Sequence, residues 1–149
     1  MFLNSKTEGY VLGSDGCGTI VEVGENVSPD LVGKYASFYM DAWANYALKE
    51  AKYCLTFDSS KLNFRETACS YVNPLTALGM FHTVTSMRTK RAMQTAASSN
   101  VARIFIKLCQ VNKITVINIV RRQASATMLE KELNQKYVPI VNDLQITEQ

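Results

Sequence analysis

The spacing of apolar residues changes twice between residues 91 and 122. A short apolar run leads into small polar residues, and a β-branched run covers residues 114–120. Between them, apolar residues recur at helical spacing, at Val101, Ile104, Phe105 and Leu108. This order predicts a strand, a turn, a helix and a second strand, which together form a βαβ unit. Such a unit usually holds a nucleotide on its first strand–helix turn, although the turn here has no glycine.

The pattern continues with one more helix and one more strand. Met128, Leu129 and Leu133 share one face of a helix predicted over residues 124–135. A strand is predicted over residues 137–141, where its proline favours an edge or a strand end. Three strands that alternate with two helices make one half of a doubly wound parallel sheet.

The first part of the chain has a different character, because six of the seven glycines precede residue 34. Short, partly alternating runs predict strands over residues 19–23, 35–39 and 44–48. Further on, Asn63 and Glu66 have the spacing of a capping box. Asn73 is predicted as the N-cap of another helix, with Pro74 at its first position. We therefore expect an α/β protein with a β-rich domain over residues 1–62. Connecting helices and half a parallel sheet are expected over residues 63–149.

Composition and charge narrow the function classes. The net charge is only +3, and lysine and arginine are scattered, which argues against nucleic-acid binding. The four cysteines lie far apart without a C-x-x-C pair, which argues against zinc and favours a reducing, intracellular compartment. No run is long and apolar enough to predict a membrane span, and no stretch has the form of a secretory signal.

Several stretches resemble, in order, the medium-chain dehydrogenase/reductase family, and in particular its zinc-free quinone reductases and mitochondrial 2-enoyl-thioester reductases. These stretches are Gly13–Gly24, Val32–Ala36, Trp43–Ala47, the V-N-P-x-T-A motif at Val72–Ala77 and the strand end Ile117–Arg122. The resemblance implies a partial GroES-like β-rich region followed by a truncated Rossmann-like sheet of βαβαβ order.

The departures from the family pattern are as informative as the matches. Ser14 stands where zinc-dependent members carry histidine, so the resemblance implies no zinc. The family's glycine-rich turn, A-x-x-G-G-V-G, falls on Ala97–Ala102, where no glycine is present. The family's N-terminal segment and the second half of its nucleotide-binding sheet find no match in this sequence. We therefore assign no catalytic residue and leave open whether the chain is an enzyme.

Candidate cofactor-binding residues lie at the predicted turn. Ser99, Asn100 and Val101 begin the helix, whose free N–H groups and positive dipole end suit an anion. Alternatively, Ser99 or Asn100 simply caps the helix. Arg121 and Arg122 follow the second strand about 20 residues after the turn, where NAD-binding folds place an acid for the ribose. Arginine suits a 2′-phosphate instead, so NADPH is implied over NADH; a solvated strand end is the alternative.

Four further residues have two interpretations each. Asn73 and Thr76 match positions near the family's nicotinamide pocket, but they can equally be helix-start and packing residues. Trp43 and Tyr46 either line a substrate cleft or, as we favour, pack in a core or an interface.

These observations lead us to favour a reduced, non-catalytic relative of the dehydrogenases. Such a protein would act as an accessory subunit, with other protein subunits, in a larger assembly that the enoyl-reductase resemblance suggests is mitochondrial. The alternative is an NADPH-dependent enoyl-thioester or quinone oxidoreductase completed by another chain. A small nucleotide-sensing module is a third hypothesis, because it needs the arginines but no catalytic residue.

Overall fold

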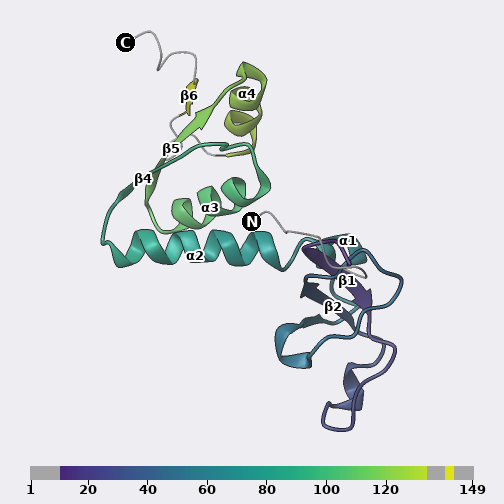
Figure 1. Ribbon diagram of the computed structural model, residues 1–149. Coiled ribbons are helices and arrows are strands. Elements are labelled where there is room, and N and C mark those ends of the chain that lie inside the picture. Colours follow the sequence, from purple (N-terminus) through teal and green to yellow (C-terminus); the bar gives the residue numbers. More distant parts are fainter. Residues whose placement is uncertain (1–10, 134–139, 143–149) are drawn as a thin grey trace. The chain divides into compact units, whose positions relative to one another are not determined.

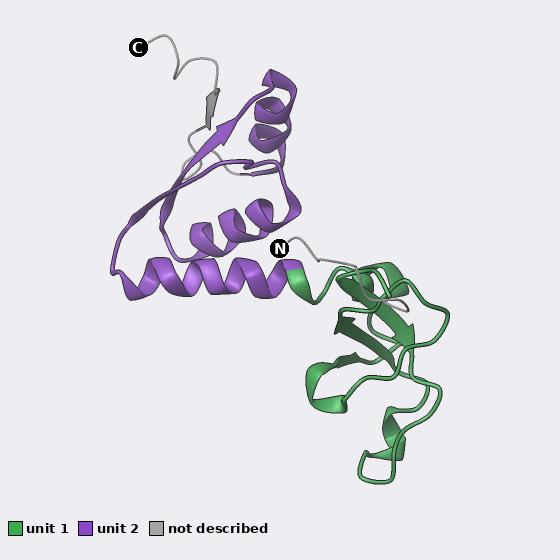
Figure 2. Cartoon of the chain, in the orientation of Figure 1, with its two compact units in different colours: residues 1–72 green, residues 73–149 purple. Residues whose placement is uncertain are grey.

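The computed structural model describes residues 11–133 and 140–142 (Figure 1). The chain divides into two compact units, residues 1–72 and residues 73–149 (Figure 2). The elements of the first unit are β1 (Asp15–Thr19), β2 (Tyr35–Tyr39), β3 (Leu55–Phe57) and α1 (Phe64–Ala68), with short 3₁₀ turns at Pro29–Leu31 and Ala51–Tyr53. The second unit follows from α2 (Val72–Ser86) through β4 (Arg91–Gln94), α3 (Asn100–Val111), β5 (Thr115–Val120) and α4 (Gln123–Glu132) to β6 (Ile140–Asn142).

The first unit is an antiparallel sheet of order β1-β2-β3. Its register pairs Cys17 with Ser37 and Ser37 with Leu55. Because cross-strand partners point to the same face, this row lies on one side of the sheet. The Ser37 hydroxyl donates a hydrogen bond to the carbonyl of Thr67 on α1, and both residues are fully buried. The helix therefore covers this face of the sheet.

Two of the predicted strands in this unit were wrong. The strand expected at residues 19–23 lies at Asp15–Thr19, over residues whose glycines suggested turns. Gly16 pairs with Phe38, and a Cβ on Gly16 would lie 2.4 Å from the Phe38 ring, so the strand requires a glycine there. The expected strand at residues 44–48 is absent, and β3 pairs with β2 instead.

The second unit confirms the predicted βαβαβ order. Its strands form a parallel sheet of order β4-β5-β6, and Gln94 at the end of β4 pairs with Asn118 of β5. The buried side chains of β5 alternate, as do those of a strand with one covered face. α3 buries residues at positions i, i+3, i+4 and i+7: Ala102, Phe105, Ile106 and Cys109. Burial of each large apolar side chain contributes roughly 1.5–3 kcal/mol, so this face of α3 fixes the helix on the sheet.

The ends of several helices differ from their predictions. α2 begins at Val72, two residues before the predicted first helical residue Pro74, so Asn73 lies in its first turn and is not the N-cap. The capping box of Asn63 and Glu66 is confirmed at the start of α1. α4 covers Gln123–Glu132 of the helix predicted over residues 124–135, whose last two residues lie outside the described part of the chain. Residues 137–139 of the last predicted strand also lie outside it. Within the described residues, no helix combines the length and apolar character needed to cross a membrane.

Candidate functional site

The β4–α3 turn lies at the carboxyl end of the parallel strands, the edge at which open α/β sheets bind ligands. The N–H of Ala97 donates to the carbonyl of Ile119 at 3.4 Å, and this bond ties the turn to β5. The N–H of Ser99 donates to the carbonyl of Ala96 at 2.9 Å and closes the turn. The turn is thus held by backbone hydrogen bonds and does not depend on glycine for its closure.

One residue of the turn has a left-handed backbone, which glycine would adopt without steric cost. Ala96 has φ of +50°, whereas Asn100, the residue whose chemistry best tolerates that conformation, is the first helical residue of α3. Ala96 is exposed and its neighbour Ala97 is fully buried. The chain therefore keeps the tight turn with alanine in the strained position.

The start of α3 has a capped first turn with free backbone N–H groups, the feature on which the predicted anion site depends. Ser99 is the N-cap, and its hydroxyl accepts a hydrogen bond from the N–H of Ala102 at 3.3 Å. The Ser99 carbonyl accepts from the N–H of Arg103 at 3.0 Å. The first N–H groups of a helix have no partner within the helix, so those of Asn100 and Val101 are the ones that an anion can bind. Ser99 therefore caps the helix, and the binding of an anion to the N–H groups of Asn100 and Val101 stays a prediction.

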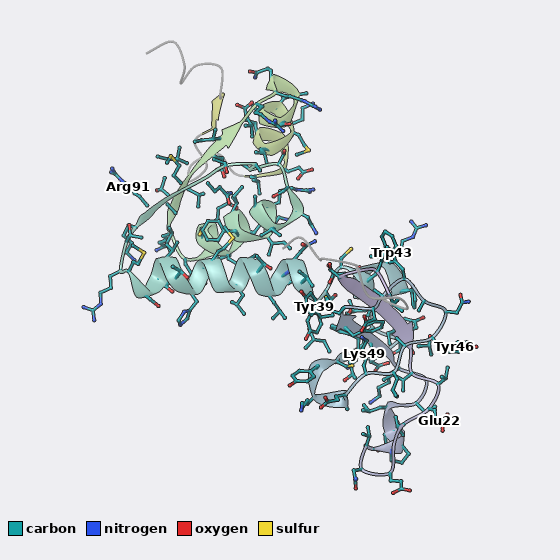
Figure 3. The ribbon with its side chains drawn as sticks, in the orientation of Figure 1. Glu22, Tyr39, Trp43, Tyr46, Lys49 and Arg91 are labelled. Atoms are coloured by element: carbon teal, nitrogen blue, oxygen red, sulfur yellow. The ribbon has the colours of Figure 1, made fainter. Side chains whose placement is uncertain are left out.

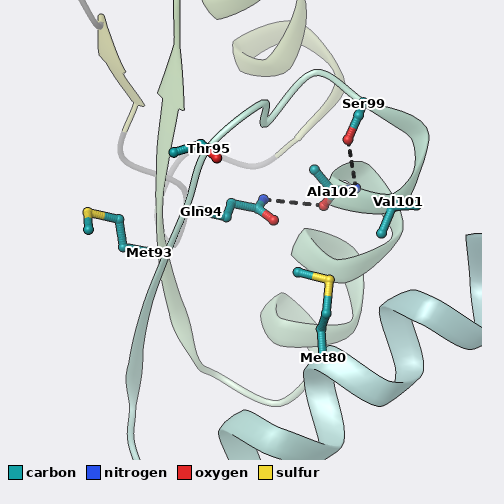
Figure 4. A pocket seen from close by; sticks show the side chains of 7 residues that line it. All are labelled: Met80, Met93, Gln94, Thr95, Ser99, Val101 and Ala102. Atoms are coloured by element: carbon teal, nitrogen blue, oxygen red, sulfur yellow. Dashed lines mark hydrogen bonds between the residues drawn. The ribbon is translucent and has the colours of Figure 1, made fainter. Parts of the chain in front are cut away.

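A pocket of about 440 Å³ lies beside this turn (Figure 4). It is lined by Met80 of α2, Met93 and Gln94 of β4, Thr95 and Ser99 of the turn, and Val101 and Ala102 of α3. The lining includes no residue of β5. The pocket is thus on the α2 side of the turn.

The side chains of Gln94 and Asn118 form a buried amide pair next to the turn, which the sequence analysis missed. Gln94 Nε2 donates to Asn118 Oδ1 at 2.7 Å and to the carbonyl of Ala102 at 3.4 Å. Asn118 Nδ2 donates to the carbonyl of Val116 at 3.0 Å. Gln94 Oε1 is buried and has no hydrogen-bond partner among the described residues, an arrangement that costs about 1–3 kcal/mol when it is left unmet. The signal in the sequence was an amide residue next to apolar residues in each of the two strands.

Arg121 and Arg122 directly follow β5, at the same edge of the sheet as the turn. Both are exposed, and in residues 11–133 neither side chain forms an ion pair. The backbone carbonyl of Arg122 accepts from the N–H groups of Ser125 and Ala126 at the start of α4. Both side chains are thus exposed and have no ion pair with another described residue, and their role at a 2′-phosphate stays a prediction.

Asn73 and Thr76 lie in the first two turns of α2. Thr76 and Met80 are four residues apart and therefore share one face of the helix, and Met80 lines the pocket. The structure thus relates Thr76 to the pocket through α2.

The first unit has a cavity of its own, also about 440 Å³, bordered by β1, β2 and the loop before β3. Tyr46 and Lys49 both line this cavity. Lys49 Nζ forms an ion pair with Asp41 at 2.8 Å and lies 5.5 Å from the centre of the Phe38 ring. Trp43 and Tyr46 are 75% and 81% exposed (Figure 3), so they do not pack in the core of this unit; the other half of that expectation, packing in an interface, stays a prediction.

The cysteines are all free thiols, and burial raises the pKa of Cys17, Cys54 and Cys109, the last to about 11. Lys49 partly offsets the effect of burial on the pKa of Cys54. Within the described residues, no cluster of three or more histidine, cysteine or acidic side chains could hold a metal ion.

Comparison with known proteins places this geometry in context. No family model matches the sequence. The mitochondrial enoyl-[acyl-carrier-protein] reductase of Caenorhabditis elegans is 28% identical over 125 residues, which are 81% of this chain and 36% of that protein. The crystal structure of a candidate NADPH:quinone reductase from Mesorhizobium loti is 31% identical, with a TM-score of 0.75 over 88% of this chain and 39% of its own. The chain resembles the medium-chain dehydrogenase/reductases.

The likeness to the medium-chain dehydrogenase/reductases extends across both units. The Escherichia coli quinone oxidoreductase, solved in complex with NADPH, shares the fold over 92% of this chain and 45% of its own, with a TM-score of 0.74 at 18% identity. The predicted resemblance and the α/β fold class are thereby confirmed. The chain spans less than half the length of each of these proteins, from 36% to 45%.

Proposed function

We propose that this chain binds NADPH through its parallel βαβαβ unit and serves as the nucleotide-binding part of an NADPH-dependent oxidoreductase. The observation that carries this proposal is that two arginines and the N-terminus of a helix lie at the same edge of the parallel sheet. Arg121 and Arg122 follow β5 without an ion-pair partner in the described residues, and the N–H groups of Asn100 and Val101 begin α3 at the same edge.

The residues at this edge fit the charged parts of NADPH. The N-terminus of α3 suits the pyrophosphate, because free N–H groups and the helix dipole both favour negative charge. The arginines suit the 2′-phosphate through charge-assisted, bidentate hydrogen bonds. Asn73 and Thr76 on α2 would lie toward the nicotinamide. NADPH, when bound, supplies a hydride. As in the proteins it resembles, the acceptor would be an enoyl thioester or a quinone.

The test is a fluorescence titration of the full chain with NADPH and with NADH. Loss of a hydrogen bond to a charged group costs about 1.5–3 kcal/mol, so Arg121→Ala should weaken NADPH binding by about 10- to 100-fold. NADH binding should change far less, because NADH has no 2′-phosphate. Arg91→Ala is the matched control, since Arg91 is an exposed arginine at the opposite end of β4 (Figure 3). Absence of binding at millimolar NADPH, or equal losses in the two variants, would refute the proposal.

A non-catalytic accessory subunit is the second candidate, and exposed apolar side chains favour it. Trp43, Tyr46 and Leu48 are clustered in sequence, and Leu48 is 99% exposed in the first unit. Large aromatic residues on a surface are typical of protein interfaces. In this hypothesis, the chain would persist as a structural subunit of a larger assembly, which the resemblance to a mitochondrial reductase suggests is mitochondrial.

Two measurements separate these functions. Oxidation of NADPH by the pure chain with a 2-enoyl thioester or a quinone would exclude the non-catalytic function. The native mass of the chain after gentle extraction from its own cells tests the accessory function. Stoichiometric migration with a large assembly supports a subunit, whereas a free monomer or dimer excludes it.

A further inference from the structure

The amide pair under the turn has one fixed orientation. The carbonyl of Val116 can only accept a hydrogen bond, so the Asn118 group that faces it at 3.0 Å must be the Nδ2 donor. Asn118 Oδ1 therefore faces Gln94, and the Gln94 group at 2.7 Å from it must be Nε2. Reversal of the Gln94 amide would bring an oxygen against two acceptors, Asn118 Oδ1 and the carbonyl of Ala102. Gln94 Oε1 is consequently the atom without a partner among the described residues.

This unpaired acceptor belongs to a residue that lines the pocket. Gln94 is only 8% exposed, and its Oε1 has no partner among the described residues. Figure 4 shows the Gln94 amide between β4 and α3, with the side chain of Met80 extending toward it from α2. Methionine is unbranched and flexible, so a shift of the Met80 side chain can open Oε1 to a ligand in the pocket. Buried acceptors without partners are rare in native proteins, which makes this one a marker of a missing donor.

The position of the pocket indicates which part of a nucleotide would supply that donor. In the proposed function, Arg121 and Arg122 after β5 bind the 2′-phosphate of the adenosine half, and the start of α3 binds the pyrophosphate. The pocket is lined from α2, β4, the turn and α3 but not from β5. The pocket therefore lies on the side of the pyrophosphate away from β5, where the nicotinamide riboside half of the cofactor would lie. That half carries two ribose hydroxyls and a carboxamide, all of which can donate.

We infer that Gln94 is a cofactor-binding residue whose Oε1 accepts a hydrogen bond from the nicotinamide riboside half of NADPH. This inference rests on the proposed function. The role of Asn118 is to hold the Gln94 amide so that Oε1 faces the pocket, and the carbonyl of Ala102 fixes the same amide against the first turn of α3. This arrangement favours ligands with a hydrogen-bond donor at this point, because a ligand without one leaves Gln94 Oε1 unpaired.

The experiment compares two variants with two probes. Gln94→Met removes Oε1, whereas Asn118→Leu breaks the same amide pair but keeps Oε1. The probes are NADPH and adenosine 2′-phosphate 5′-diphosphate, which lacks the nicotinamide riboside. Gln94→Met should weaken NADPH binding by about 10-fold, the loss of roughly one hydrogen bond, and leave the binding of the shorter probe unchanged. Asn118→Leu should weaken NADPH binding less than Gln94→Met does, because Oε1 is retained and the carbonyl of Ala102 still accepts from Gln94 Nε2.

Each other outcome is decisive. If Gln94→Met weakens both probes equally, Gln94 only shapes the turn and the inference is overturned. If its NADPH affinity is unchanged while Arg121→Ala loses affinity, the inference fails and the proposed function stands. If the wild-type chain binds neither probe, both fail.

A measurement on the wild-type chain covers the case in which Gln94→Met does not fold. The side-chain amide signals of Gln94, assigned through their proximity to Asn118, should shift in nuclear magnetic resonance spectra when NADPH is added. They should not shift with the shorter probe. Absence of a shift with saturating NADPH overturns the inference.

Discussion

The left-handed alanine in the β4–α3 turn gives a direct test of how this turn is built. Ala96 is exposed and has φ of +50°, so its Cβ makes no core contact that a glycine would lose. The left-handed conformation costs an L-residue roughly 1–2 kcal/mol. Glycine removes this cost but adds about 0.4–1 kcal/mol of conformational entropy to the unfolded chain. Ala96→Gly should therefore stabilise the second unit by about 0.5–1 kcal/mol.

Ala97→Gly is the matched control because it makes the same chemical change one residue later. Ala97 is fully buried and does not have a positive φ. This substitution removes a buried methyl group, which contributes about 0.8 kcal/mol, and it increases the conformational entropy of the unfolded chain as Ala96→Gly does. We therefore expect Ala97→Gly to destabilise the unit by about 1–2 kcal/mol, opposite in sign to the first variant.

Hydrogen exchange of the amides in α3 and β5 measures the effect where it occurs, since exchange rates report the free energy of local or global opening. Ala96→Gly should slow the exchange of these amides by about 2- to 5-fold, and Ala97→Gly should accelerate it. Urea unfolding followed by circular dichroism gives an independent value. Destabilisation by Ala96→Gly comparable to that by Ala97→Gly would show that the turn does not hold a strained residue.

Two further predictions concern other parts of the chain. Burial raises the pKa of the Cys109 thiol from an ordinary 9.0 to about 11. As the pH rises, the unfolded chain therefore loses this proton before the folded chain does. The free energy of unfolding should then fall between pH 9 and 11 by up to about 1.4 kcal/mol per pH unit. Urea unfolding across this range should show a shallower fall in Cys109→Ala, and equal slopes would contradict the assignment. Asn63→Ala removes the capping box, in which Asn63 Oδ1 accepts from the N–H of Glu66 at 3.0 Å, and should lower the melting temperature through a loss of about 1 kcal/mol. Asn45→Ala, at an exposed position, is its control and should stay within about 0.5 kcal/mol.

The second unit could be predicted because its elements follow from local patterns. The helical spacing from Val101 to Leu108 and the β-branched run of β5 each specify one kind of element, and both were confirmed. In the first unit, the capping box at Asn63 likewise depends on residues only three positions apart. Local signals of this kind do not require knowledge of which segments meet in space.

The first unit could not be predicted as well, because its strands depend on contacts between distant residues. Gly16 reads as a turn residue in isolation, but it is needed where the Phe38 ring crosses β1. The run at residues 44–48 alternates like a strand, yet β2 has its second partner in Leu55–Phe57. The amide pair of Gln94 and Asn118 was missed for the same reason. Its members are 24 residues apart, and only the parallel register brings them together.

The absence of glycine in the turn does not by itself exclude a nucleotide. Glycines in such a turn have three physical roles, namely the tight turn, the close packing of helix on strand, and the approach of the backbone to the pyrophosphate. Ala96 meets the first with a left-handed backbone, and the small side chains of Ala97 and Ala102, both buried, meet the second.

Only for the third role does a larger residue replace the glycine. Asn100 lies at the start of α3, where the backbone would approach the phosphates. Asn100 is exposed, so its side chain can turn toward solvent and leave its N–H to the anion. Asn100→Gly should then leave NADPH affinity unchanged within about 2-fold, whereas a 10-fold gain would show that the asparagine obstructs the site. The first result favours a functional cofactor site with substituted glycines. The second favours a site that has lost part of its affinity, as expected for a protein retained for its interactions.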